Sequence, residues 1–342
     1  MSIRIVYVTT VGGDAEIFGR MAALSARSLR FVEPDAEIVV LTDGPVGAAL
    51  ESFFPAGVEF VPVDSIPYAD PVARSRYIKT SVAEYVAAPF LFIDSDTLVV
   101  RPFLQKLSRS KYEMMASYNR HRGFPATTPW ASWTRGIFDL EKEPFPPRKH
   151  YNSGVIFCKD KHAAAAFYEK WHSVWRRQWE QLGVARDQPC FNLSIAAVSL
   201  RFGSLPMTYN ACLAASPSFA RRAAVWHFTG AGKGANGRGN TLLGRLLKAV
   251  GTEPSETDTL LAEEMAKAKH QFDARNFVSN PQDYGPVHYV EGVKKALRVR
   301  DYEAFSYLFG EICRTAPFSR GMVKLIAKGI PKATLAGLLR RT

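Results

Sequence analysis

The sequence predicts an α/β fold built on a mainly parallel, mixed sheet with helices on both faces. Short apolar runs, each ended by turn residues, alternate with segments of helical periodicity through the first hundred residues. Alternation at this spacing is typical of parallel sheets with crossover helices. With 342 residues, 47% of them hydrophobic, the chain can bury one large core and carry an appendage.

The predicted elements follow one another in order through the first part of the chain. A strand over residues 3–9 leads into a helix over 14–29, where apolar residues recur on one face. A buried strand at 37–42 closes with an Asp-Gly-Pro turn. The next elements are a strand at 58–63, a helix at 77–86 and a strand at 90–93.

The pattern changes in the second part of the chain. Residues 119–150 combine prolines with aromatic residues, and we expect a long irregular loop there, of the kind that is usually functional or mobile. Five glycines within residues 230–239 predict a flexible loop and a boundary between a domain at 1–235 and a helical C-terminal region at 241–342. Between these loops we predict a strand at 151–158, helices at 161–181 and 187–198, and a strand at 223–228.

Composition narrows the classes of protein. No apolar run reaches the roughly 18 residues of a membrane span, and the N-terminus lacks the pattern of a signal peptide. The four cysteines are scattered without Cys-x-x-Cys pairs, which favours a reduced, cytoplasmic protein.

The net charge of +12 calls for an anionic partner: nucleic acid, a membrane surface or a phosphorylated substrate. No nucleic-acid-binding motif is present, so we expect no nucleic acid partner. No acidic residue follows Glu311, and residues 317–342 combine basic and apolar residues at helical spacing. Such a tail predicts attachment to an anionic membrane surface, here the inner face of the cytoplasmic membrane, although a helix packed on the body has the same pattern.

Two carboxylates, Asp94 and Asp96, follow the apolar run Phe90-Leu91-Phe92-Ile93 directly. Residues i and i+2 of an extended chain project to the same side, so both can converge on one cation. Close carboxylates repel each other unless a positive charge lies between them. The pair therefore predicts a divalent metal at a strand end, although an ordinary surface turn has the same spacing.

His227 ends a second apolar run and is followed by a glycine-rich loop with a lysine. An imidazole suits Mn²⁺ better than Mg²⁺, and Gly230 would let the backbone approach a ligand closely. Lys233 supplies a point charge suited to a phosphate. Two carboxylates, a histidine and a lysine together predict a site that holds a diphosphate and neutralises its charge as it leaves.

These pieces, together with Lys79, Asn152-Ser153-Gly154, Asp187-Gln188 and a Leu-Pro segment ending at Asn210, resemble in their order the family-eight glycosyltransferases. That group includes glycogenin and bacterial lipopolysaccharide galactosyl- and glucosyltransferases, and the resemblance covers about residues 1–235. It implies the GT-A fold and a retaining hexosyltransferase that uses a UDP-sugar. The implied acceptor is a glycan or a lipid-linked molecule in cell-surface polysaccharide or lipopolysaccharide synthesis, with galactose or glucose favoured as the sugar.

The resemblance also implies roles for individual residues. The metal, Mn²⁺ with Mg²⁺ as an alternative, would be bound by Asp94, Asp96 and His227. The diphosphate and the donor would be contacted by Gly230, Lys233 and Lys79, the donor sugar by Asn152 and Gly154, and the anomeric carbon would lie beside Asp187 and Gln188. In the family the first strand runs into an acidic residue near the uracil, whereas here Thr9 stands at that point and is the candidate.

Other interpretations remain open from sequence alone. A sugar nucleotidyltransferase would carry a phosphate loop after the first strand, but Gly12-Gly13 is followed by Asp14 and Glu16, which would repel a triphosphate. A degenerate protein that binds a sugar nucleotide without turnover is a further alternative. Individually, Lys79 fits a helix-surface lysine, Asn152 a turn residue and Asp187 a helix N-cap.

Overall fold

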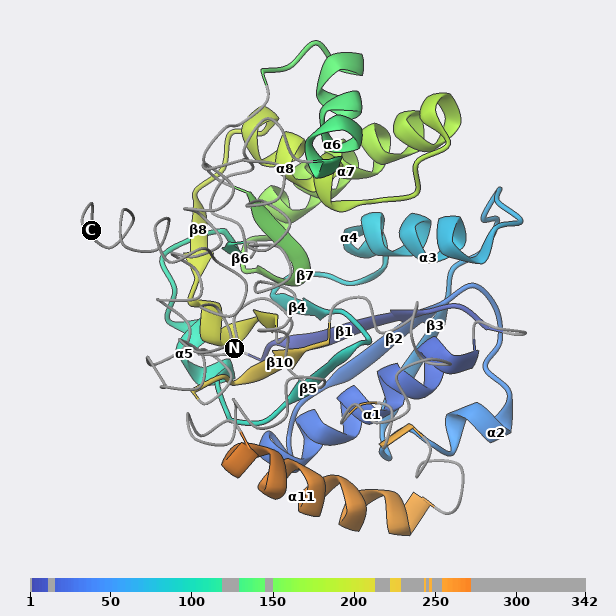
Figure 1. Ribbon diagram of the computed structural model, residues 1–342, viewed down its shortest axis with the longest axis vertical. Helices are drawn as coiled ribbons and strands as arrows, with labels where there is room; N and C mark the ends of the chain where they lie inside the picture. The colour runs from blue at the N-terminus through green and yellow to red at the C-terminus, as the bar shows by residue number, and fades with distance from the viewer. Residues whose placement is uncertain are drawn as a thin grey trace, which may run out of the picture.

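The computed structural model describes residues 2–11, 16–118, 129–144, 150–212, 222–228, 243, 246–247 and 254–271. Within these residues, seven strands form the main sheet in the order β3-β2-β1-β4-β7-β6-β8 (Figure 1). Strand β7 is antiparallel to both of its neighbours, and the other strands run parallel to one another. The strands are β1 (Arg4–Thr9), β2 (Ile38–Thr42), β3 (Val58–Pro62), β4 (Phe90–Ile93), β6 (Met114–Tyr118), β7 (Tyr151–Cys158) and β8 (Phe202–Leu205).

Helices cover both faces of this sheet (Figure 1). Helix α1 (Glu16–Val32) lies on one face, and α3 (Pro71–Thr80), α4 (Val82–Tyr85), α7 (Lys161–Leu182) and α8 (Gln188–Ala197) lie on the other. Alternate residues of β1 enter different cores: Val6 and Val8 pack on the α7 side, and Ile5 and Tyr7 on the α1 side. Burial of both strand faces explains the continuous apolar runs in the sequence, and the predicted α/β fold is confirmed.

A second, smaller sheet joins segments that are far apart in the sequence. It has the order β5-β10-β9, where β5 is Thr97–Val99, β9 is Ala211–Cys212 and β10 is Val225–His227. Strand β10 pairs antiparallel with β5, with His227 opposite Thr97. This pairing brings the end of β10 next to the turn that links β4 to β5.

Two predicted elements differ from the structure. The helix predicted at 77–86 begins earlier, at Pro71, where Asp70 Oδ1 accepts a hydrogen bond from the Ala73 amide at 2.7 Å. The segment predicted as an irregular loop contains helix α6 (Pro129–Leu140). Proline at the first helical position loses no helical hydrogen bond, so Pro129 begins a helix where we expected it to prevent one.

Short helices connect the larger elements, and one further helix, after the second sheet in sequence, packs on α1. The short helices are α2 (Ala48–Glu51), α5 (Leu104–Ser108) and the 3-10 helix η2 (Met207–Tyr209). Helix α11 (Pro254–Gln271) packs on α1, where Leu261 and Met265 share a core with Leu24, and Arg27 Nη1 lies 2.8 Å from Asp258 Oδ1. The predicted tail at 317–342 lies outside the described residues.

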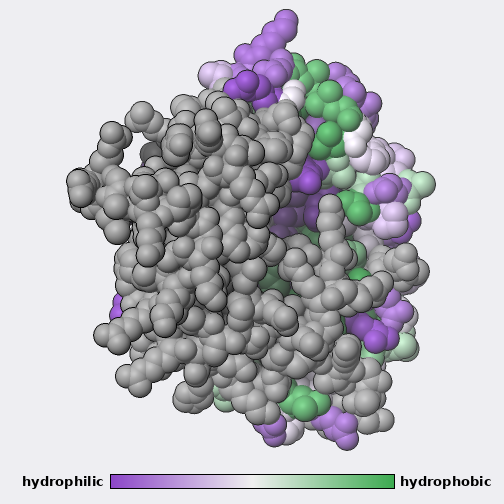
Figure 2. All heavy atoms as spheres, viewed as in Figure 1, coloured by the Kyte–Doolittle hydropathy of each residue, from purple (hydrophilic) through white to green (hydrophobic). Residues whose placement is uncertain are grey.

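The described surface holds no large apolar patch on the face drawn in Figure 2, where hydrophobic residues form small separate areas among hydrophilic ones. The large hydrophobic side chains that are exposed, Phe31, Val72, Tyr85 and Leu182, come from different elements. In the described part of the chain, none of the helices has the length and hydropathy needed to cross a membrane.

Candidate active site

Asp94, Asp96 and His227 converge as the sequence predicted. Asp94 directly follows β4, Asp96 directly precedes β5, and His227 ends β10. His227 Nε2 lies 3.1 Å from Asp96 Oδ1 and 3.9 Å from Asp94 Oδ2. One ligand atom from each residue lies within 4.8 Å of the others. Two carboxylates and an imidazole at this separation form a donor set that fits Mn²⁺.

Backbone and hydroxyl contacts hold the turn that carries the two aspartates. Thr97 Oγ1 donates to the Asp94 carbonyl at 2.9 Å, and Ser25 Oγ of α1 lies 2.7 Å from Thr97 Oγ1 behind it. On the other side, the Phe228 amide donates to the Asp96 carbonyl and the Asp94 amide to the Gly154 carbonyl, each at 2.8 Å. The carboxylates are therefore fixed by three separate elements before any cation binds.

The charges in this group favour a cation. Burial alone would raise the pKa of Asp96, but His227, Lys79 and Arg76 outweigh burial and lower it. Burial alone would lower the pKa of His227, but Asp96 and Cys212 together outweigh burial and raise it well above its ordinary value. A metal ligand must be a neutral imidazole, so a bound metal would replace the proton that His227 otherwise carries.

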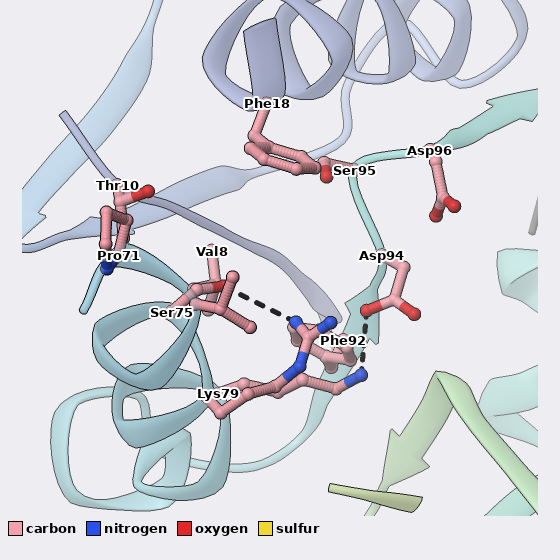
Figure 3. Close-up of a pocket in the computed structure, with 12 residues that line it drawn as sticks. Val8, Thr10, Phe18, Pro71, Ser75, Lys79, Phe92, Asp94, Ser95 and Asp96 are labelled. Atoms are coloured by element: carbon pink, nitrogen blue, oxygen red, sulfur yellow. Dashed lines mark hydrogen bonds and ion pairs between the residues drawn. The ribbon is translucent and has the colours of Figure 1, made fainter. Parts of the chain in front are cut away.

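Lys79 of α3 connects the metal ligands to a second buried carboxylate. Its Nζ lies 2.9 Å from Asp94 Oδ1 and 3.0 Å from Asp187 Oδ2, and its side chain is only 3% exposed. Figure 3 shows Lys79 reaching Asp94 at the floor of a cavity between α1, α3 and the end of β4. The lining residues are Val8, Thr10, Phe18, Pro71, Val72, Ser75, Arg76, Lys79, Phe92, Asp94, Ser95 and Asp96. A helix-surface role for Lys79 is excluded by this burial.

Asp187, at the start of α8, is held by two cations and a hydroxyl. Lys79 and Arg76 Nε lie 3.0 and 3.1 Å from its two oxygens, and Ser153 Oγ donates to Oδ2 at 2.7 Å. Its side chain makes no capping bond to the helix. Burial alone would raise the pKa of Asp187, but Lys79, Arg76 and Ser153 together lower it to about 2. Asp187 is therefore ionised at neutral pH.

The depressed pKa of Asp187 predicts an acid-sensitive contribution to stability. A folded-state pKa of about 2, against an ordinary 3.8, stabilises the fold fully above pH 4. That contribution, about 2 kcal/mol, is lost as the pH falls from 4 to 2. We expect Asp187→Asn to lower the free energy of unfolding by at least this amount at pH 7, because it also leaves Lys79 without one partner. Urea unfolding at several pH values measures it, and equal stability of the two proteins at pH 7 would contradict it.

Four polar side chains, Asn152, Gln188, Asn210 and His150, form a hydrogen-bonded group beside the metal ligands. Asn152 Nδ2 donates to Gln188 Oε1 at 3.0 Å, and Asn210 Nδ2 donates to Asn152 Oδ1 at 2.7 Å. Asn210 Oδ1 lies 2.7 Å from His227 Nδ1, and Gln188 Nε2 lies 3.0 Å from His150 Nε2. Burial lowers the pKa of His150 to about 4, so its ring is neutral at pH 7.

Gly154 of β7 lies against the metal ligands. A Cβ built on Gly154 would lie 2.4 Å from His227 Cε1, 2.7 Å from Asp94 Oδ2 and 2.8 Å from Asn152 Oδ1. No side chain larger than hydrogen fits between these atoms. A glycine is therefore required for Asp94 and His227 to approach each other beside β7.

The structure brings most of the predicted site residues together. Lys79, Asn152, Gly154, Asp187 and Gln188 surround the metal group as described above, whereas Gly230 and Lys233 lie outside the described residues. Thr9 is buried with its hydroxyl on the Thr10 carbonyl, and Thr10, not Thr9, lines the cavity.

Sequence reasoning missed the roles of Arg76, Ser153 and Asn210. Arg76 lies one helical turn before Lys79, and this i, i+3 spacing was a signal that could have found it. Ser153 and Asn210 lie within segments that the sequence had already singled out, but their partners are set by tertiary contacts.

The main sheet and its helices match solved glycosyltransferases. The galactosyltransferase LgtC, solved with donor and acceptor sugar analogues, aligns with a TM-score of 0.50 and 17% identity over 76% of this chain and 96% of its own. The glycosyltransferase GlyE of Streptococcus pneumoniae TIGR4 aligns with a TM-score of 0.46 and 13% identity over 78% of this chain and 65% of its own. Mouse xyloside xylosyltransferase 1 aligns with a TM-score of 0.44 and 11% identity over 67% of this chain and 98% of its own. No protein-family model matches the sequence, and no curated protein does. The likeness to LgtC shows the fold, which is the predicted GT-A fold.

Proposed function

We propose that this chain, which has the GT-A fold, is a metal-dependent hexosyltransferase that moves galactose or glucose from a UDP-sugar to a glycan or lipid-linked acceptor with retention. The observation that carries the proposal is the convergence of Asp94, Asp96 and His227 beside a cavity whose cations are Lys79 and Arg76. The group lies beyond the carboxyl end of β4, where ligands bind in open α/β sheets. Synthesis of cell-surface polysaccharide or lipopolysaccharide is the proposed setting.

The residues present fit a divalent cation, and Mn²⁺ suits the imidazole better than Mg²⁺. Asp94, Asp96 and His227 would hold it, and when bound it would neutralise the charge that grows on a departing diphosphate. Lys79 adds a buried positive charge 2.9 Å from Asp94. Gly230 and Lys233 remain proposed contacts of the diphosphate, within a catalytic domain proposed to span 1–235.

Asp187 and Gln188 are proposed to act at the donor sugar by electrostatics and orientation. A carboxylate that already accepts two ion pairs and a hydroxyl hydrogen bond is a poor nucleophile and a poor base. Its fixed negative charge can instead stabilise positive charge that develops on the sugar ring. The Gln188 side chain, held by Asn152 and His150, presents a fixed dipole to the same region. In this mechanism the departing phosphate oxygen takes the proton of the acceptor hydroxyl.

Arg76 is a testable second cation of the donor site. Its Nε is held by Asp187 at 3.1 Å, its Nη1 donates to Ser75 Oγ at 3.4 Å, and its side chain lines the cavity. Its Nη2 would therefore be the group that meets a phosphate or a sugar hydroxyl. We expect Arg76→Ala to raise the donor KM about tenfold, the loss of one charged hydrogen bond. Arg109→Ala, on the exposed end of α5, is the matched control. A donor KM equal to that of the wild type would remove Arg76 from the donor site.

Donor hydrolysis without acceptor tests the proposed function directly. The purified chain would be incubated with UDP-, GDP- and ADP-sugars in Mn²⁺, in Mg²⁺ and in EDTA, and released nucleotide would be measured. Mn²⁺-dependent release of UDP from one hexose donor is the expected result. Release from a GDP-sugar would overturn the UDP assignment, and no release with no metal-dependent nucleotide binding would favour a degenerate sugar-nucleotide-binding protein.

The proposed location is the cytoplasm, with attachment to the inner face of the cytoplasmic membrane through residues 317–342. The support is the basic, apolar pattern of that segment, in which no acidic residue occurs. Sedimentation with vesicles containing anionic lipid, for the full chain and for a deletion of 317–342, tests it. Equal binding by both proteins would end the proposal.

A further inference from the structure

We propose that Asn210 and Asn152 form a one-way hydrogen-bond relay that positions the ring of His227 and the side-chain amide of Gln188 together. Both asparagines would act as positioning residues, because the side-chain oxygen of each is already hydrogen-bonded: Asn210 Oδ1 faces His227 Nδ1, and Asn152 Oδ1 accepts from Gly154 and Asn210. The significance of the His227 end rests on the metal site proposed above. The geometry of the relay stands on the hydrogen bonds alone.

The direction of the relay follows from one backbone amide. The Gly154 N–H can only donate, so the Asn152 side-chain atom 2.8 Å away must be its carbonyl oxygen. The Asn210 side-chain atom 2.7 Å from that same oxygen must then be a donor, its Nδ2. Asn210 Oδ1 is left facing His227 Nδ1 at 2.7 Å, and because an amide oxygen only accepts, Nδ1 must carry the hydrogen. The other ring nitrogen, Nε2, is thereby aimed at the two carboxylates.

The same reasoning applies to the other half of the relay, from Asn152 to His150. With its oxygen assigned, Asn152 turns its Nδ2 to Gln188, whose nearer atom must be Oε1 at 3.0 Å. Gln188 Nε2 then faces His150 Nε2 at 3.0 Å, so that ring nitrogen accepts. A neutral His150 is required for this bond, and its burial provides one. Every donor from His227 to His150 therefore points in one direction.

Burial gives the relay its effect. Asn210 is 1% exposed, Asn152 6% and His227 2%, so none of these groups can exchange its partner for bulk water. Turning one amide would place two donors or two acceptors against each other at both of its ends, in a medium where that is costly. The orientation of a metal ligand and that of Gln188 are thus set by the same bonds. If Asn152 only contacted the donor sugar, it would not need hydrogen bonds to both Asn210 and Gln188.

A double-mutant cycle on Mn²⁺ affinity tests the relay without any turnover. The dissociation constant of Mn²⁺ would be measured by electron paramagnetic resonance, with no nucleotide present, for Asn152→Leu, Asn210→Leu and the double variant. We expect Asn210→Leu to weaken Mn²⁺ binding roughly 10- to 100-fold, the usual effect of losing the partner of a metal-bound histidine. Asn152→Leu should also weaken it, although within the described residues the hydrogen bonds of the Asn152 side chain go to Gly154, Gln188 and Asn210 and not to His227 or the two aspartates. The double variant should be no worse than Asn210→Leu.

Control variants separate positioning from packing. Asn192→Leu removes buried hydrogen bonds to the backbone of Tyr151 and of Gln188 but to no side chain of the relay, and it should leave Mn²⁺ affinity unchanged. If leucine prevents folding, Asn152→Ala and Asn210→Ala remove the same hydrogen bonds without added bulk. Wild-type Mn²⁺ affinity in the Asn152 variant, or strictly additive effects in the cycle, would overturn the relay.

A second measurement tests the His150 end of the relay and needs no metal. In Asn152→Asp the introduced carboxylate still accepts from Gly154 and Asn210 but cannot donate to Gln188. The Gln188 amide should then turn over, present its oxygen to His150 and move the ring proton of His150 to Nε2. Nitrogen-15 chemical shifts of labelled histidine report this tautomer, and an unchanged His150 would overturn the relay. If the wild type binds no Mn²⁺, the proposed metal site fails and this measurement alone decides the relay.

Discussion

Replacing Asp96 with asparagine should lower metal-dependent donor turnover about a thousandfold, because a bound cation contributes several kcal/mol to the stabilisation of a departing diphosphate. Asp96 is the cleaner of the two aspartates to change. Asp94 also pairs with the buried Lys79, so its replacement would disturb a structural contact as well. The charged partner of the Asp96 side chain within the described residues is His227, at 3.1 Å. Loss of one carboxylate removes a ligand and a negative charge together.

The measurement is UDP release at saturating donor over a titration of Mn²⁺, with Mn²⁺ affinity measured in parallel. Asp35→Asn is the matched control, since Asp35 is exposed in the turn between α1 and β2, at the amino-terminal end of the parallel strands, whereas Asp96 lies beyond the carboxyl-terminal end of β4. Circular dichroism of both variants should match that of the wild type. If Asp96→Asn kept full turnover and full Mn²⁺ affinity, the metal would have to be held elsewhere.

The parts of the fold that were predictable are those in which local pattern and burial agree. The runs Ile38–Thr42 and Phe90–Ile93 are buried on both faces, so they read as continuous apolar segments closed by turn residues. Asp94 and Asp96 were found because their carboxylates interrupt such a run. His227 was found for the same reason, at the end of another apolar run.

The missed elements depend on contacts that no local pattern reports. Strand β8 pairs with β6 across 88 positions of sequence, from Met114 to Phe202, and its own residues alternate only weakly. Helix α6 was hidden by prolines that lie at its first position or outside it. The spacing to Lys79 pointed to Arg76, but its partner Asp187 and the partners of Asn210 are set by tertiary contacts. Tertiary pairing, not composition, decides the roles of these residues.

Gly154 offers the second test, because it depends on space and not on charge. The alanine Cβ would lie within 2.9 Å of two metal ligands and of Asn152, and the nearest contact is with a ring carbon of His227. None of these atoms is the end of a flexible surface side chain. His227 is held by Asn210, and Asp94 by Lys79 and the backbone of Gly154 itself. The strain of one methyl group must therefore be relieved by moving a metal ligand or the strand.

We expect Gly154→Ala to weaken Mn²⁺ binding and to reduce donor turnover at least a hundredfold, with a loss of about 1–3 kcal/mol of stability from overpacking. Gly136→Ala, within helix α6, is the matched control, because among the described residues its Cβ would meet Leu182 at an ordinary 3.5 Å. Alanine there should stabilise the protein by about 0.5–1 kcal/mol and leave turnover unchanged. Normal Mn²⁺ affinity in Gly154→Ala would mean that Asp94 and His227 do not hold one ion between them. The outcome therefore bears on the metal site without altering any of its ligands.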